Sequence, residues 1–73
     1  MPKLADLLAQ AEQNVAEGEK LVAEQRQNVE EIKQRGEDAY FYECVLQEME
    51  TSLHLMHQYR QALQEEASLA HLA

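Results

Sequence analysis

The stretch that decides the fold is residues 8–35, which read LAQAEQN VAEGEKL VAEQRQN VEEIKQR in four consecutive blocks of seven. The first places of the blocks hold Leu8, Val15, Val22 and Val29, and the fourth places hold Ala11, Gly18, Gln25 and Ile32. Apolar residues that alternate in steps of three and four form one stripe along an α-helix. A helix with such a stripe buries it against another helix. The stretch therefore predicts one long helix that needs a helical partner.

The composition supports helices and a need for association. The 73 residues include only two Gly, one Pro and no Trp, and 45% are apolar, which is typical of a single helical domain. A core of this size rarely contributes more than about 3–5 kcal/mol without a disulfide, a metal or a partner chain. The single cysteine, Cys44, cannot form an internal disulfide. Association with another chain is the expected source of further stability.

One strong break divides the chain into two helices. The first helix is predicted at about residues 3–35 and the second at about 39–67, with a turn at 36–38. Gly36 fits the left-handed residue that ends a helix, and Asp38 fits the N-cap of the next one. A connection this short makes the two helices antiparallel, in one hairpin domain that spans residues 1–73.

The second helix carries a stripe of larger residues: Tyr42, Leu46, Met49, Leu53, Met56, Arg60, Leu63, Ala67 and Ala70. Large side chains on one helix interdigitate with small ones on the other. The pattern leaves the register open by one heptad, so that Gly18 lies near Leu53 in one arrangement and near Arg60 in the other. Gln25 at a core place either selects register and oligomeric state or points its amide to water.

Further apolar residues flank both stripes: Leu7, Leu21, Phe41, Val45, Leu55 and Tyr59. A lone hairpin leaves these flanks in water, whereas two hairpins packed together cover them. The sequence therefore predicts an all-α antiparallel two-helix coiled-coil hairpin that dimerises into a four-helix bundle. The predicted core and interface residues are Val15, Val22, Val29, Ile32, Tyr42, Leu46, Met49, Leu53, Met56 and Leu63.

The aromatic residues Tyr40, Phe41 and Tyr42 are consecutive, at the start of the second helix. Successive residues of a helix point about 100° apart, so the three rings cannot all face one core. Tyr42 is expected to fill the hairpin core and Phe41 to pack on a second hairpin. Tyr40 is expected to keep its hydroxyl in water. The alternative is that the cluster anchors a different protein.

The charge balance limits the classes of partner. The chain has 14 acidic and 6 basic residues, for a net charge of −8. Such a chain is expected to repel nucleic acid and anionic membranes, and to attract a basic protein. The sequence contains no run of about 18 apolar residues, so no membrane-spanning helix is expected. The N-terminus lacks the apolar core of a signal peptide. A cytoplasmic location with a reduced thiol is predicted.

The sharpest chemical pattern is Glu50, His54 and His57, which are spaced i, i+4, i+7 on one helix face. A carboxylate and two imidazoles in this geometry suit a metal ion. The alternative is a solvated polar face, since the first helix contains no histidine to complete a site. No Ser/His/Asp or Cys/His arrangement is present, and a hairpin offers no pocket of its own. The sequence thus predicts no enzyme and no cofactor.

One resemblance covers most of the chain. The run Ala11-Glu12-Gln13-Asn14-Val15-Ala16-Glu17-Gly18-Glu19, followed by Val22-Ala23-Glu24-Gln25-Arg26, resembles a group of small uncharacterised bacterial proteins. Their later pattern is matched by Gly36, Asp38, Glu50-Thr51, Leu53, Arg60 and Leu63. The chain departs from the group at Gln13 and Asn14, where those proteins often carry histidine or basic residues. The resemblance implies a bacterial helical hairpin without an established activity.

The functional prediction is a non-enzymatic interaction or assembly module, a small acidic adaptor or regulator. Its expected partners are a second copy of itself and a basic or helical protein. The alternatives are a metal-binding bundle that uses Glu50, His54 and His57, and an acidic inhibitor of a nucleic-acid-binding protein.

Overall fold

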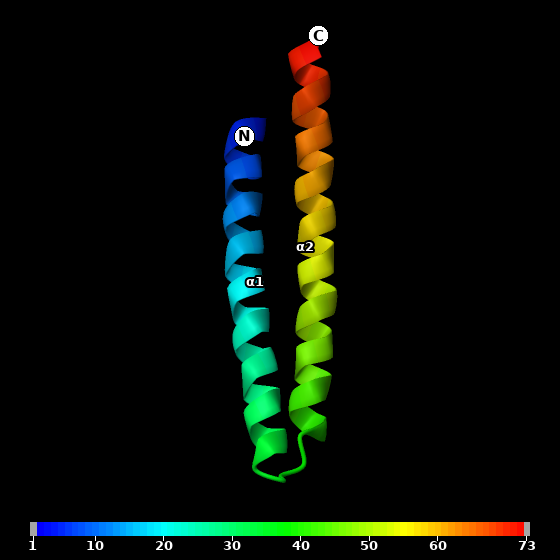
Figure 1. The fold of residues 1–73 in the computed structure, drawn as a ribbon. Helices are drawn as coiled ribbons and strands as arrows, with labels where there is room; N and C mark the ends of the chain where they lie inside the picture. The colour runs from blue at the N-terminus through cyan, green and yellow to red at the C-terminus, as the bar shows by residue number, and fades with distance from the viewer. Residues whose placement is uncertain (1, 73) are drawn as a thin grey trace.

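A computed structural model describes residues 2–72 and shows two long helices side by side (Figure 1). Helix α1 spans Leu4–Gln34 and helix α2 spans Tyr40–Leu72. The predicted all-α antiparallel hairpin is confirmed, in a molecule that measures 58 × 19 × 14 Å. Helix α2 continues past the predicted end at residue 67, so its C-terminal end projects beyond the start of α1 (Figure 1).

The end of α1 is closed by backbone hydrogen bonds around Gly36. This residue has a φ of 75°, in the left-handed region that glycine adopts without strain. Its N–H donates to the carbonyl of Lys33 at 2.9 Å, and the N–H of Glu37 donates to the carbonyl of Ile32 at 3.2 Å. These two bonds form a Schellman motif, which satisfies the last carbonyls of the helix. The prediction that Gly36 ends the first helix is confirmed.

Helix α2 begins one residue later than predicted. The carbonyl of Ala39 accepts the first helical hydrogen bond, from the N–H of Glu43 at 2.8 Å. Asp38 therefore precedes the N-cap, but its Oδ1 accepts the N–H of Tyr40 at 2.9 Å and so performs the expected capping role. Ala39 itself is buried.

The core is narrow and lies along the predicted stripe. The buried apolar residues are Ala11, Val15, Val22, Val29, Ala39 and Leu63. Ile32, Leu46, Met49 and Leu53 are half-buried, as expected for a seam covered from one side. Each fully buried valine contributes roughly 1.5–3 kcal/mol. Among residues 2–70, whose burial is described, no buried residue is larger than leucine, so the core of one hairpin is thin.

Two of the predicted core residues stay largely accessible in the single chain. Met56 is 37% exposed and Tyr42 is 43% exposed. The prediction that Tyr42 fills the hairpin core is wrong, because its ring instead meets Phe41 edge to face, with centroids 5.5 Å apart. The buried place near the turn is taken by Ala39.

The structure also settles the register of the two helices. A Cβ placed on Gly18 would lie 3.0 Å from Cδ1 of Leu53 and 3.3 Å from Sδ of Met56. Gly18 therefore faces Leu53 and not Arg60, and its missing side chain makes room for both neighbours. Gln25 is half-buried, and its amide donates to the carbonyl of Tyr42 across the seam at 3.1 Å. The amide therefore contacts the facing helix and does not point only to water.

Within residues 2–72, neither helix combines the length and the apolar character required to cross a membrane.

Candidate functional site: two unlike edges of the hairpin

The seam between the helices has a polar edge on one side. Two cross-helix ion pairs and one histidine–carboxylate hydrogen bond define it, one contact for each heptad: Lys33 with Glu43, Arg26 with Glu50, and Glu19 with His57. Their N–O distances are 2.9, 3.4 and 3.2 Å in that order. All six residues stand next to the core stripe, since the e positions of two antiparallel helices face each other along one side of the seam.

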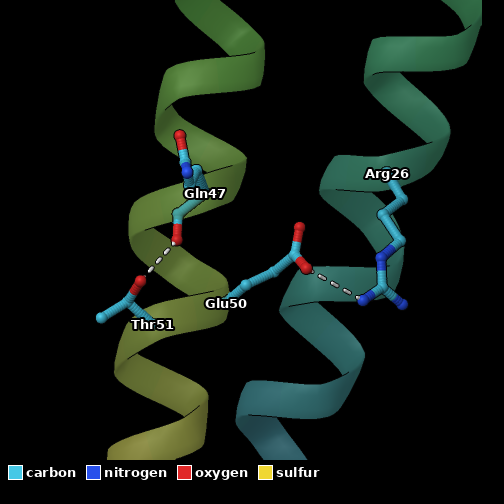
Figure 2. Close-up of polar contacts among 4 residues, drawn as sticks. All are labelled: Arg26, Gln47, Glu50 and Thr51. Carbon is cyan, nitrogen blue, oxygen red and sulfur yellow. Dashed lines mark hydrogen bonds and ion pairs between the residues drawn. The ribbon is translucent and has the colours of Figure 1, made fainter.

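Figure 2 shows the middle pair of the polar edge. The carboxylate of Glu50 leaves α2 and points toward the guanidinium of Arg26 on α1. One residue further along α2, Thr51 turns its hydroxyl back to its own helix and donates to the carbonyl of Gln47 at 3.0 Å (Figure 2). The hydroxyl of Thr51 is therefore bonded within α2, whereas Glu50 makes the contact with α1.

The main effect of these pairs is on register. Arg26 and Glu50 are about half exposed, and a pair of this kind contributes only about 0.2–1 kcal/mol. Sliding the helices by one heptad would keep only one base opposite an acid, Arg26 with Glu43 or Lys33 with Glu50, and the first of these slides would also place Glu19 opposite Glu50. The observed register keeps both bases opposite acids, so the order of charges along each helix favours it.

His57 connects the polar edge with the seam. Its Nδ1 lies 3.1 Å from Nη2 of Arg60, and its Nε2 lies 3.2 Å from Oε1 of Glu19. Because a guanidinium only donates, Nδ1 accepts this bond, and the neutral imidazole then carries its hydrogen on Nε2 and donates it to Glu19. Nε of Arg60 is buried and has no hydrogen-bond partner among the described residues.

The structure does not bring the predicted metal ligands together. Glu50 is paired with Arg26, and His54 meets the amide of Gln58 at 3.2 Å. His57 is held between α1 and the seam, as described above. Across the described part of the chain, no group of three or more His, Cys, Asp or Glu side chains is close enough to hold a metal ion.

Two side chains near the turn have perturbed acidities. Glu43 accepts a hydrogen bond from Lys33 and attracts its charge, which raises the pKa of that ammonium above its usual 10.5. One turn into α2, a hydrogen bond with the thiol of Cys44 raises the pKa of the Tyr40 hydroxyl, and the charge interaction between the two groups acts in the same direction. Both effects keep these groups protonated at neutral pH, so neither supplies a base for catalysis.

The opposite side of the seam is an apolar edge. A groove of about 270 Å³ opens there between the helices, beside Gly18 and Val22 of the core. Its rim includes Leu21 on α1 and Val45, Met49 and Met56 on α2. The cross-helix ion pairs within the described residues all lie on the other edge. One side of the seam is therefore covered by charged side chains, and the other side exposes an apolar groove.

Sequence reasoning did not identify the polar edge. The signal was present in the fifth place of each heptad of the first helix, where Glu12, Glu19, Arg26 and Lys33 follow one another. On the second helix the facing order is Glu43, Glu50, His57 and Gln64. Placing Arg26 and Lys33 opposite Glu50 and Glu43 selects the observed register of the two helices.

No protein-family model, no curated protein and no solved structure matches this chain. Membership of a bacterial family of helical hairpins therefore stays a prediction.

Proposed function

We propose that this chain is a non-enzymatic assembly module that acts by packing its helices against other helices, first of all those of a second copy. The observation that carries the proposal is the large surface of the single hairpin, 5807 Å². A compact monomer of 8.4 kDa is expected to expose about 4,600 Å². The surplus of about 1,200 Å² exceeds the roughly 800 Å² that each partner buries in a standard interface.

The kind of surface supports the same proposal. The large apolar residues that remain exposed are Leu21, Tyr40, Phe41, Tyr42, Leu55, Met56, Tyr59 and Leu69. Small proteins with thin cores gain stability by association, because the interface buries apolar area that the fold alone leaves in water. Two hairpins in a four-helix bundle would cover the apolar edge and leave the polar edge in water.

The acidic surface suits a further partner of opposite charge. A net charge of −8 attracts a basic protein and disfavours direct contact with nucleic acid or an anionic membrane. In this proposal the bundle is the scaffold and its acidic outer faces dock the regulated protein. The proposed location is the cytoplasm, where the half-buried thiol of Cys44 stays reduced.

The test is absolute molar mass by light scattering, measured across a wide concentration series. We expect a mass of twice the 8.4 kDa chain, with dissociation only on strong dilution. Circular dichroism on the same samples would establish that the chain is helical throughout the series. A helical protein that keeps the mass of one chain at every concentration would overturn the proposal.

A further inference from the structure

Helix α2 carries a second stripe of apolar residues outside the seam. From residue 41 onward, alternating steps of four and three reach positions 41, 45, 48, 52, 55, 59, 62, 66 and 69. Six of these nine positions are apolar: Phe41, Val45, Leu55, Tyr59, Ala62 and Leu69. Each position of this second stripe precedes a seam position by one residue, so the stripe is centred about 100° around the helix from the seam. Most of it faces away from α1, and Val45 at its inner margin borders the groove between the helices.

The second stripe is exposed in the single hairpin. Phe41, Leu55, Tyr59 and Leu69 have 53–69% of their surface accessible. The stripe is continuous with the apolar edge, because Val45, Glu48 and Ser52 also line the groove. The equivalent positions of α1 hold two apolar residues, Leu7 and Leu21, and six polar ones: Gln10, Asn14, Glu17, Glu24, Asn28 and Glu31. Helix α2 thus has two apolar faces and α1 has one.

We infer that the second stripe binds the same stripe of a second copy, with the two α2 helices antiparallel and Leu55 on the two-fold axis. This inference rests on the proposed function, since it assigns the surface through which two copies associate. A symmetric dimer uses one self-complementary patch on both subunits. The stripe runs from residue 41 to residue 69, so only an axis at its midpoint, residue 55, lets the two stripes cover each other completely.

The order of residues along the stripe fits the antiparallel arrangement. Phe41 of one copy lies opposite Leu69 of the other, and the small Ser52 lies beside the large Tyr59, offset by one residue. Small side chains facing large ones allow the two helices to interdigitate. A parallel arrangement would instead place every residue opposite itself.

Charge disfavours that parallel arrangement. It would bring Glu48 against Glu48 and Glu66 against Glu66, and each chain already has a net charge of −8. In the antiparallel dimer, the two copies of Glu48 are separated by about 21 Å along the axis, at about 1.5 Å per residue. The surplus surface of the hairpin supplies the area that such an interface needs.

The experiment is disulfide trapping in a Cys44→Ser background, with Leu55→Cys as the reporter. At the two-fold axis the two introduced thiols meet, so mild oxidation should give a covalent dimer on a non-reducing gel. The matched variant is Leu69→Cys, the same chemical change on the same stripe. In the antiparallel dimer its two thiols lie about 42 Å apart along the axis. We expect Leu55→Cys to form the covalent dimer at least about tenfold faster, because its thiols share a high effective concentration.

A third variant, Gln13→Cys on the exposed face of α1, measures the rate of random collision. Comparable trapping at positions 55 and 69 would show a parallel pairing and overturn the inference. Trapping at position 55 no faster than at position 13, in a protein whose mass is still that of a dimer, would assign the interface to another surface. That result would leave the proposed function standing. A protein that is monomeric by light scattering would overturn both.

Discussion

Replacing Gly18 with alanine sets two effects of similar size against each other. Alanine is favoured over glycine inside a helix by about 0.8–1.0 kcal/mol. The new Cβ would lie 3.0 Å from Cδ1 of Leu53 and 3.3 Å from Sδ of Met56, closer than the usual 3.5–4.0 Å. Both neighbours are ends of flexible side chains, and Met56 borders an open groove. Rotamer shifts of this kind cost about 0.5–1.5 kcal/mol. The two effects therefore nearly cancel, and Gly18→Ala should change the stability by no more than about 0.7 kcal/mol in either direction.

Replacing Gly18 with leucine should destabilise the protein. Leucine adds four carbon atoms to glycine, three more than alanine does, and these would have to enter the space that Leu53 and Met56 already occupy. Overpacking of this kind costs about 1–3 kcal/mol, which outweighs the gain in helix propensity. The series therefore separates the effect of the backbone from that of close packing.

The assay is thermal unfolding followed by circular dichroism at one fixed protein concentration, because association makes Tm depend on concentration. For a chain of this length, 1 kcal/mol corresponds to about 4–8 °C. Ala16→Leu, on an exposed face of α1, is the matched control and should leave Tm nearly unchanged. A Gly18→Leu protein with the Tm of the wild type would refute the close approach of the helices at Gly18, and with it the register.

Three further perturbations test the seam, the turn and the polar edge. Leu53→Asp should abolish the helical signal at neutral pH, because it puts a charge into the half-buried seam; a protein that stays helical would contradict the assigned heptad. Gly36→Ala should cost about 1 kcal/mol in urea unfolding, through its φ of 75° alone, since no atom lies within 4 Å of the added Cβ; an unchanged midpoint would mean that this residue is not left-handed. Arg26→Glu should destabilise the protein by up to about 1 kcal/mol at low salt, and adding Glu50→Arg should restore the stability. A double variant no more stable than the single one would show that these two residues do not interact across the seam.

Much of the fold could be predicted because spacing alone fixes which face of a helix is apolar. The four buried residues of α1 occupy first or fourth places of the heptads: Ala11, Val15, Val22 and Val29. The turn was equally accessible, since Gly36 is the residue type that tolerates the left-handed conformation. The end of α2 was placed too early, because the Ala-rich and Leu-rich residues after position 67 are good helix formers without a stop signal.

The register could not be predicted from the apolar pattern, for a physical reason. A pattern that repeats every seven residues looks the same after a slide of seven. What breaks this symmetry is a set of unique features, such as the missing side chain at Gly18 and the change from acid to base between Glu19 and Arg26. Those features act between helices, so they become decisive only when both partners of each contact are considered together.

The aromatic cluster shows a second limit. Three consecutive rings cannot share one face, so the sequence establishes that at least one is exposed but does not establish which. The assignment of Tyr42 to the core rests on its place in the apolar stripe with Leu46 and Met49. In the structure the chain enters α2 through the buried Ala39, and the rings of Phe41 and Tyr42 contact each other outside it.

The unequal faces of the two helices bear on why an assembly of these hairpins would stop at two. A surface that pairs with itself about a two-fold axis is used up in the dimer, whereas two different complementary surfaces allow continued growth. The second stripe lies on α2, whereas the corresponding positions of α1 are mostly polar and include Glu17, Glu24 and Glu31. A third hairpin would meet these carboxylates on one side and the charged polar edge on the other. In the proposed dimer, the same acids that keep α1 from offering a second apolar surface would restrict association to one closed interface and leave an acidic exterior for the proposed basic partner.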